Sequence, residues 1–149
     1  MLVSEILRIK GNALFTTPPN GTVLEAIKVM AQHDIGSLVV MDHGQMAGML
    51  TFAEVLEALA QRQGQLGDLK VSEIYVRDPL IATPHLDVME LRRSMVERHQ
   101  RYVPVQEGAT LLGVISFHDV ANAVIKETSF HNRLLKNYIK NWPEDESAK

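Results

Sequence analysis

Two stretches of the chain carry apolar residues at helical spacing, and each follows a residue that can cap a helix. Thr22 and Asp87 precede the two stretches, and each has a glutamate three positions later. This combination satisfies the free amides of a first helical turn. The apolar positions are Val23, Ala26, Ile27 and Met30 in the first stretch and Val88, Leu91 and Met95 in the second. We therefore expect helices that begin at about residues 23 and 88.

Short apolar runs follow each of these helices and predict a hairpin. Residues 38–41 and 102–105 are rich in β-branched and large apolar side chains. A polar, glycine-containing turn and a second apolar run come next, at 49–50 and at 111–115, which is typical of two antiparallel strands. Another helical segment follows each hairpin, at 53–61 and at 119–128. Each unit is thus predicted to be a short leading strand, a helix, two strands and a helix.

The second half of the chain repeats the first. Gly-Met-Leu-Thr-Phe-Ala-Glu-Val at 48–55 returns as Gly-Val-Ile-Ser-Phe-His-Asp-Val at 113–120, an offset of 65. Val-Ser-Glu-Ile at 3–6 returns at 71–74 with an offset of 68, so one loop is about three residues longer in the first copy. A tandem repeat predicts one fold of two similar halves that meet at a pocket. We assign residues 1–63 and 71–128 to the two repeats, 64–70 to a linker, and 129–149 to a C-terminal helix with a frayed tail.

Apolar residues continue at helical spacing beyond the length that the second repeat needs. They are Val120, Val124, Ile125, Phe130, Leu134, Leu135, Tyr138 and Ile139. A long helix, with a break near Ser129 as one option, would present a stripe that one module cannot cover. We therefore expect a homodimer that buries it. Trp142-Pro143 should stop the helix, and residues 144–149 should fray.

Composition narrows the classes of function. The formal charge is −3 and the lysines and arginines form no block, so we expect no nucleic-acid partner. The chain has no cysteine, which excludes disulfides, thiolate zinc sites and a cysteine nucleophile and suits the cytoplasm. No secretory signal pattern opens the sequence, and no apolar stretch approaches the roughly 18 residues of a membrane span. We expect no membrane partner.

The repeat unit resembles the cystathionine-β-synthase-type (CBS) domain. The resemblance rests on Gly-apolar-apolar-Ser/Thr-x-x-acid at the end of each third strand, on Val-x-x-Ala-x-x-x-Met in the first helix, and on two copies in register over about residues 2–126. A tandem pair of such domains is called a Bateman module. The Arg-aromatic-apolar-Pro-Val string at 101–105 is similar to the free-standing bacterial type. The resemblance implies an α+β fold with two β-α-β-β-α repeats related by a pseudo-twofold axis, and helix-to-helix pairing into a dimer.

The strand-to-helix corner of each repeat carries groups that suit a nucleotide. A hydroxyl there, from Ser116 or Thr51, lies beside the free amides and positive dipole end of the next helix, which favour a phosphate. An acid three residues later, Asp119 or Glu54, lies on the same face of the first turn. Its carboxylate can accept hydrogen bonds from two adjacent hydroxyls, as on a ribose. In the family that the chain resembles, the Ser/Thr contacts phosphate, the Asp holds the ribose hydroxyls, and the other repeat encloses the adenine.

This exchange between repeats implies two clefts. The first cleft would combine Ser116 and Asp119 with Ser4, Gly36 and Ser37. The second cleft would combine Thr51 and Glu54 with Ser72, Arg101 and Tyr102. Glu54 departs from the usual Asp, and its extra methylene weakens a bidentate ribose contact, whereas Arg101 can clamp a phosphate. We expect the first cleft to be the better ribose site, and the second to take a multiply charged ligand or to be empty.

Plainer interpretations remain open for each of these residues. Both corners can serve only as capping boxes, Arg101 as a solvated surface residue, and Tyr102 as a half-buried strand aromatic. The histidines show no metal-site spacing, so we expect no metal, and among them only His118 lies near a predicted phosphate. Phosphate-binding, dinucleotide-binding, nucleophile-elbow and zinc-protease motifs are all absent from the sequence.

The sequence therefore predicts a non-enzymatic regulatory module that needs no cofactor. It would bind AMP, ADP, ATP or NAD as a regulatory ligand between the repeats and signal energy or redox state to an effector protein that the sequence does not identify. Two alternatives remain. One is a dimerisation or assembly module that acts without ligand, and the other is a sensor of S-adenosylmethionine.

Overall fold

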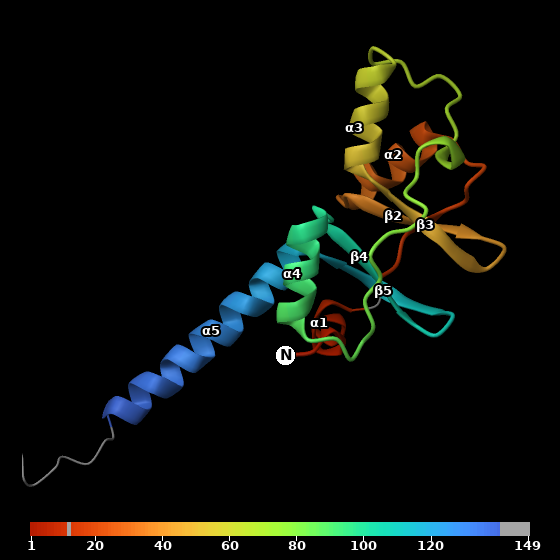
Figure 1. The fold of residues 1–149 in the computed structure, drawn as a ribbon. Helices are drawn as coiled ribbons and strands as arrows, with labels where there is room; N and C mark the ends of the chain where they lie inside the picture. Colours follow the sequence, from red (N-terminus) through yellow and green to blue (C-terminus); the bar gives the residue numbers. More distant parts are fainter. Residues whose placement is uncertain (12, 141–149) are drawn as a thin grey trace, which may run out of the picture.

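Two similar α+β halves make up the computed structural model, which describes residues 1–11 and 13–140. The first half holds β1 (Thr16–Thr17), α2 (Val23–His33), β2 (Ser37–Asp42), β3 (Gln45–Thr51) and α3 (Phe52–Gln61). The second holds α4 (Val88–Arg98), β4 (Tyr102–Glu107), β5 (Thr110–Ser116) and α5 (Phe117–Lys140). The helices α1 (Val3–Lys10) and η1 (Val71–Glu73) precede the two halves. This arrangement confirms the predicted fold class (Figure 1).

The two hairpins have the same register. Ser37 pairs with Thr51 in the first hairpin, and Tyr102 pairs with Ser116 in the second. Each hairpin has a register shift at the equivalent place, after Val40 and after Val105. The repeat in the sequence is therefore a repeat in the backbone, and it places Thr51 and Ser116 at the same corner of their units.

The prediction of a leading strand holds for only one of the two copies. In the first copy, β1 pairs in parallel with β2. In the second copy the strand is reduced to an isolated bridge between Ala82 and Val105. The Gln100 side chain accepts from the Leu80 N–H at 2.8 Å and donates to the Leu80 carbonyl at 3.0 Å. A side chain therefore satisfies the backbone groups that would otherwise have extended this strand.

The segments that precede the halves are exchanged between them. The Val3 N–H donates to the Leu86 carbonyl at 2.9 Å, and the Val71 N–H donates to the Gly21 carbonyl at 2.9 Å. The exchange extends to the cores. Val3, Ile6 and Leu7 of α1 pack into the core of the second half, whereas Leu69 and Val71 pack into the core of the first. The halves are thus interlocked, and α1, which the sequence analysis did not assign, lies beside β5 and α5.

The last helix, α5, is continuous over 24 residues. The break near Ser129 that the sequence analysis allowed is therefore wrong, because Ser129 lies within a run without proline or glycine and its side chain is exposed. Residues 128–140 are all exposed, and this part of α5 projects away from both halves (Figure 1). The predicted stop at Trp142-Pro143 and the predicted fraying lie outside the described residues. Among the described residues, no helix is both long enough and apolar enough to cross a membrane.

Candidate functional site

The corner at the start of α3 forms a capping box. The Thr51 N–H donates to Glu54 Oε1 at 2.8 Å, and the Thr51 hydroxyl donates to Glu54 Oε2 at 3.0 Å. The Ala53 N–H in turn donates to Thr51 Oγ1 at 3.2 Å. The capping role that the sequence left open is therefore present here. The Glu54 carboxylate can still accept further hydrogen bonds, because each of its oxygens has two lone pairs.

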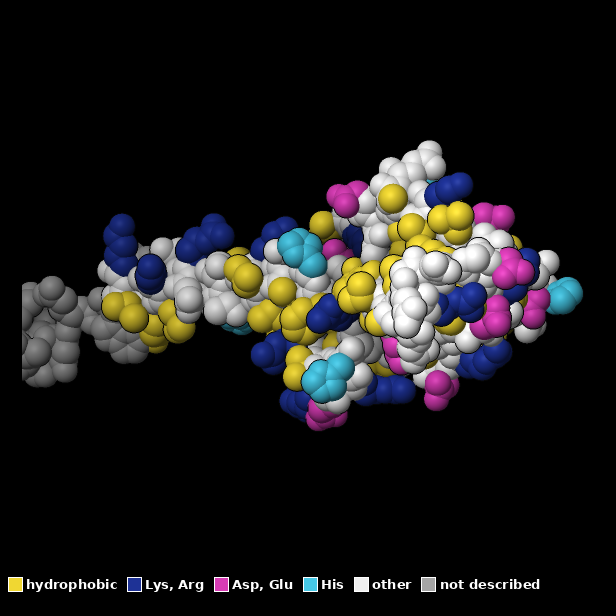
Figure 2. All heavy atoms as spheres, turned by 90° about the horizontal axis from the view of Figure 1, so that it is seen from above, with side chains coloured by type: hydrophobic (Ala, Val, Ile, Leu, Met, Phe, Trp, Pro, Cys, Tyr) yellow, Lys and Arg dark blue, Asp and Glu magenta, His cyan; other side chains and the backbone are white. Residues whose placement is uncertain are grey.

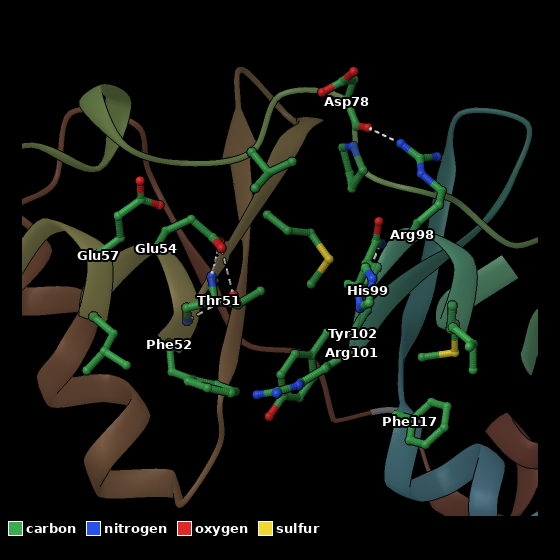
Figure 3. A pocket seen from close by; sticks show the side chains of 18 of the residues that line it. Thr51, Phe52, Glu54, Glu57, Asp78, Arg98, His99, Arg101, Tyr102 and Phe117 are labelled. Atoms are coloured by element: carbon green, nitrogen blue, oxygen red, sulfur yellow. Dashed lines mark hydrogen bonds between the residues drawn. The ribbon is translucent and has the colours of Figure 1, made fainter.

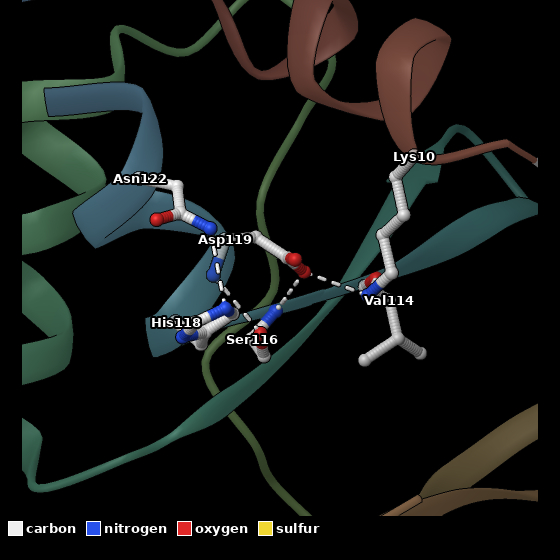
Figure 4. A network of polar contacts seen from close by, with 6 residues as sticks. All are labelled: Lys10, Val114, Ser116, His118, Asp119 and Asn122. Carbon is white, nitrogen blue, oxygen red and sulfur yellow. Dashed lines mark hydrogen bonds and ion pairs between the residues drawn. The ribbon is translucent and has the colours of Figure 1, made fainter. Parts of the chain in front are cut away.

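The corner at the start of α5 carries the same box and one further partner. The Ser116 N–H donates to Asp119 Oδ2 at 2.9 Å, and the Asp119 N–H donates to Ser116 Oγ at 3.1 Å. Lys10, at the end of α1, donates from Nζ to Asp119 Oδ2 at 2.7 Å and to the Val114 carbonyl at 2.8 Å (Figure 4). Burial raises the pKa of Asp119, but the hydrogen bonds and charge of Lys10 and the hydrogen bonds from Ser116 outweigh it and lower that pKa overall. The carboxylate is therefore ionised at neutral pH.

The second cleft lies between the two halves and has a volume of about 940 Å³. Thr51, Glu54 and Glu57 line one wall, and Figure 3 shows them facing residues of the other half across the opening. Its volume lies within the roughly 300–1,000 Å³ that small-molecule sites occupy. The facing polar residues are Asp78, Arg98, His99, Gln100 and Arg101, and the apolar lining includes Met49, Val76, Pro79, Met95, Val96 and Tyr102. A ligand here would contact both repeats at once.

The first cleft is smaller, at about 540 Å³. It brings together residues of both repeats and the end of α1. Among the predicted residues, it is lined by Gly36, Ser37, Ser116, His118, Arg101 and Tyr102, and Lys10 lines it as well. The His118 Nε2 lies 3.2 Å from the Asn122 side-chain nitrogen. Asp119 does not line this cleft, and its carboxylate points toward Lys10 (Figure 4).

Aromatic and cationic side chains separate the two clefts. Phe52, Phe117, Arg101 and Tyr102 line both of them. The Tyr102 ring lies edge-on to Phe52 with centroids 6.2 Å apart, and Arg101 Cζ lies 5.3 Å from the centroid of the Phe52 ring. The Tyr102 hydroxyl occupies the space that a side chain at Gly36 would need. Gly36 is therefore required by this close approach, and the tyrosine forms a wall between the clefts.

Three predicted site residues line neither cleft. Asp119 is one of them, and Ser4 and Ser72 are the others. Ser4 lies in α1, where its N–H donates to the Pro84 carbonyl at 2.9 Å. Ser72 lies in η1, where its N–H donates to the Pro19 carbonyl at 2.8 Å. These two serines therefore contribute their backbone to the exchange between the halves.

Sequence reasoning also missed residues that line the clefts. Phe52 and Phe117 follow the corner hydroxyls at the same offset in both repeats, a signal that the repeat itself carried. Arg98 and Asp78 line the second cleft, and Lys10 lines the first. Lys10 lies 109 positions from Asp119, and no local motif relates the two. Within the described residues, no group of three or more His, Asp or Glu side chains is arranged to hold a metal ion.

Comparison with known proteins agrees with this architecture. One curated relative is the mitochondrial CBS domain-containing protein CBSX3 of Arabidopsis thaliana. It is 28% identical over 148 residues, which cover 93% of this chain and 71% of the relative. Among solved structures, the CBS-domain containing protein ATU1752 of Agrobacterium tumefaciens aligns with a TM-score of 0.79 at 28% identity, covering 83% of this chain and 98% of that one.

A second solved structure is that of a CBS domain pair with bound ligands. The pair from protein MJ0100, in complex with 5′-methylthioadenosine and S-adenosyl-L-methionine, aligns with a TM-score of 0.74 at 25% identity, covering 85% of this chain and 98% of that one. The model of the CBS domain matches twice, at residues 3–61 and 71–126. With two matches that together span most of its length and a fold shared with CBS domain pairs, this chain belongs to the CBS domain family.

Proposed function

We propose that this chain is a regulatory module that binds an adenosine-containing ligand in the second cleft. The observation that carries the proposal is the Thr51–Glu54 corner, which opens on a cleft of about 940 Å³ whose far wall carries Arg98 and Arg101 of the other repeat. Glu54 would accept hydrogen bonds from the ribose hydroxyls. Arg101 and the first turn of α3 would hold phosphate, and the apolar lining would enclose the base.

A second candidate ligand is S-adenosylmethionine, and the acids of the cleft favour it. Glu54, Glu57 and Asp78 line the same cavity as the two arginines, and carboxylates attract a sulfonium cation. Both ligands in the complex of the MJ0100 domain pair contain adenosine, which supports recognition of the adenosine portion that the two candidates share. Adenosine recognition is therefore common to the two candidates, and the charge of the remaining portion distinguishes them.

Ligand binding would regulate a partner through the arrangement of the two repeats. A ligand that contacts both walls of the cleft binds more tightly to the arrangement that brings the walls together, and so shifts the population toward it. The Thr51 hydroxyl is bound by Glu54 within the capping box, and we propose binding without catalysis. The effector protein, the cytoplasmic location and the absence of nucleic-acid and membrane partners remain predictions.

Calorimetric titration with AMP, ADP, ATP, NAD, NADH and S-adenosylmethionine tests the proposal. We expect at least one of them to bind with a stoichiometry of one per chain. Tighter binding of ATP than of AMP would assign the arginines to phosphate, whereas tighter binding of S-adenosylmethionine than of any nucleotide would favour the second candidate. Absence of binding by all six ligands would refute both and favour an assembly module that acts without ligand.

We further propose that α5 pairs with a second copy of the chain. Phe130, Leu134 and Leu135 are 56%, 50% and 58% exposed on the projecting part of this helix, where Figure 2 shows hydrophobic side chains along one side. Burying a leucine that a partner covers contributes about 1.5–3 kcal/mol, and a symmetric dimer contains the residue twice. Leu134→Lys is therefore expected to weaken the dimer roughly 100-fold or more, as measured by analytical ultracentrifugation.

Asn132→Lys is the matched control for the dimer. It adds the same charge to the same exposed helix, and with 3.6 residues per turn it lies nearly opposite Leu134 on the helix. We expect this variant to remain dimeric at concentrations where Leu134→Lys is monomeric. Equal dissociation constants for the two variants would contradict pairing through the Leu134 face.

A further inference from the structure

Lys10 joins the end of α1 to the acidic corner of the second repeat. Its Nζ donates to Asp119 Oδ2 at 2.7 Å and to the Val114 carbonyl at 2.8 Å. The Lys10 side chain is 37% exposed and that of Asp119 20%. The short, charge-assisted bond is therefore partly shielded from water, and it uses the same carboxylate oxygen that accepts from the Ser116 N–H.

The second cleft has no equivalent of this contact among the described residues. The hydrogen bonds that Glu54 accepts there come from Thr51, within its own corner. The residue 68 positions after Lys10 is Asp78, which lines the second cleft and carries the opposite charge. The leading helices differ too, because α1 has eight residues and η1 has three. Among the described residues, a lysine therefore contacts the acid of one corner, whereas the acid of the other corner is bound only by its own threonine.

We infer that Lys10 masks the ribose-binding carboxylate of the first cleft, so that the chain binds one adenosine-containing ligand instead of two. The inference rests on the proposed function. A ribose that bound Asp119 through both carboxylate oxygens would compete at Oδ2 with the ammonium group and the Ser116 N–H, and displacing Lys10 would also leave the Val114 carbonyl without that donor. Lys10 lines the first cleft, whereas Asp119 does not. Lys10, which belongs to neither repeat corner, is thus one of the differences between the two clefts.

Titration with adenosine tests the inference. Adenosine is neutral and has no phosphate, so a change at Lys10 cannot alter its binding through a lost phosphate contact. The wild-type chain is expected to bind one adenosine. Lys10→Met keeps most of the aliphatic stem and is expected to bind a second adenosine in the first cleft. The affinity of that cleft should be at least about tenfold higher than in the wild type. The added site should disappear in Lys10→Met/Asp119→Ala. It should also be lost with 2′-deoxyadenosine, which lacks one of the two hydroxyls.

Arg8→Met is the matched control, since Arg8 is an exposed cation on the same helix and lines neither cleft. It is expected to bind one adenosine. Lys10→Gln provides a second unmasked variant, and circular dichroism verifies that each variant is folded.

The possible outcomes separate the inference from the function on which it rests. Binding of one adenosine by both the wild type and the two Lys10 variants would overturn the masking and leave the second cleft as a site. Binding of two adenosines by the wild type would also overturn it. Absence of binding by every variant would overturn the masking together with the proposed function.

Discussion

Gly48→Ala is expected to lower the free energy of unfolding by roughly 3 kcal/mol, the cost of forcing a group into a packed interior. A Cβ at Gly48 would meet the backbone carbonyl oxygen of Val76, and it would lie 2.8 and 2.9 Å from two ring carbons of Tyr75. The Val76 segment cannot retreat easily, because Met49 and Val76 exchange backbone hydrogen bonds of 3.0 and 2.8 Å. Urea unfolding followed by circular dichroism measures the change.

Gly113→Ala is the matched control for this variant. Gly113 is the repeat equivalent of Gly48, 65 positions later. A Cβ there would meet Cδ2 of Leu7 at 3.0 Å, and the end of a leucine side chain can move by a few tenths of an ångström. We expect a loss below about 1 kcal/mol. Equal losses for the two variants would contradict the claim that the Val76 backbone makes Gly48 irreplaceable.

The sequence could predict the features of the fold that depend on local contacts. Helix caps, hairpin register and corner residues depend on positions within a few residues of one another, so the local pattern carries them. Thr22 accepts from the Glu25 N–H as predicted, and Asp87 caps α4 through the Met89 N–H. The offset of the repeat then places both corners on equivalent backbone. The main helices, the hairpins and the corners of the two repeats could therefore be predicted from the sequence.

The features that the sequence did not predict depend on contacts between segments far apart in the chain. The Leu80 backbone is satisfied by Gln100 in place of a strand neighbour, and Lys10 reaches Asp119 across the interface of α1 with the second half. Both partners are ordinary polar residues with no motif of their own. The expectation that the first cleft is the better ribose site rested on the Asp at its corner, and it left out the lysine that the exchange of leading segments brings there.

The inferred masking of Asp119 reverses the expected ranking of the clefts and gives a prediction for Glu54. Glu54→Ala is expected to weaken AMP binding by about 1.5–3 kcal/mol, the range for a lost hydrogen bond to a charged group, which is roughly 10- to 150-fold in dissociation constant. Isothermal titration calorimetry at fixed salt measures it. Asp119→Ala is expected to leave AMP binding nearly unchanged, because Lys10 already holds that carboxylate.

Further variants separate ribose binding from helix capping at Glu54. Glu54→Gln keeps a residue that can complete the capping box but removes the charge, so its thermal stability should match the wild type while its AMP affinity falls. Glu54→Asp should restore most of the affinity, since it recreates the acid of the other corner. Glu57→Ala, on the same wall and one turn further along α3, should bind AMP almost as the wild type does. A dissociation constant for Glu54→Ala equal to that of Glu57→Ala would remove the ribose contact from the second cleft and leave Thr51 and Glu54 as a helix cap alone.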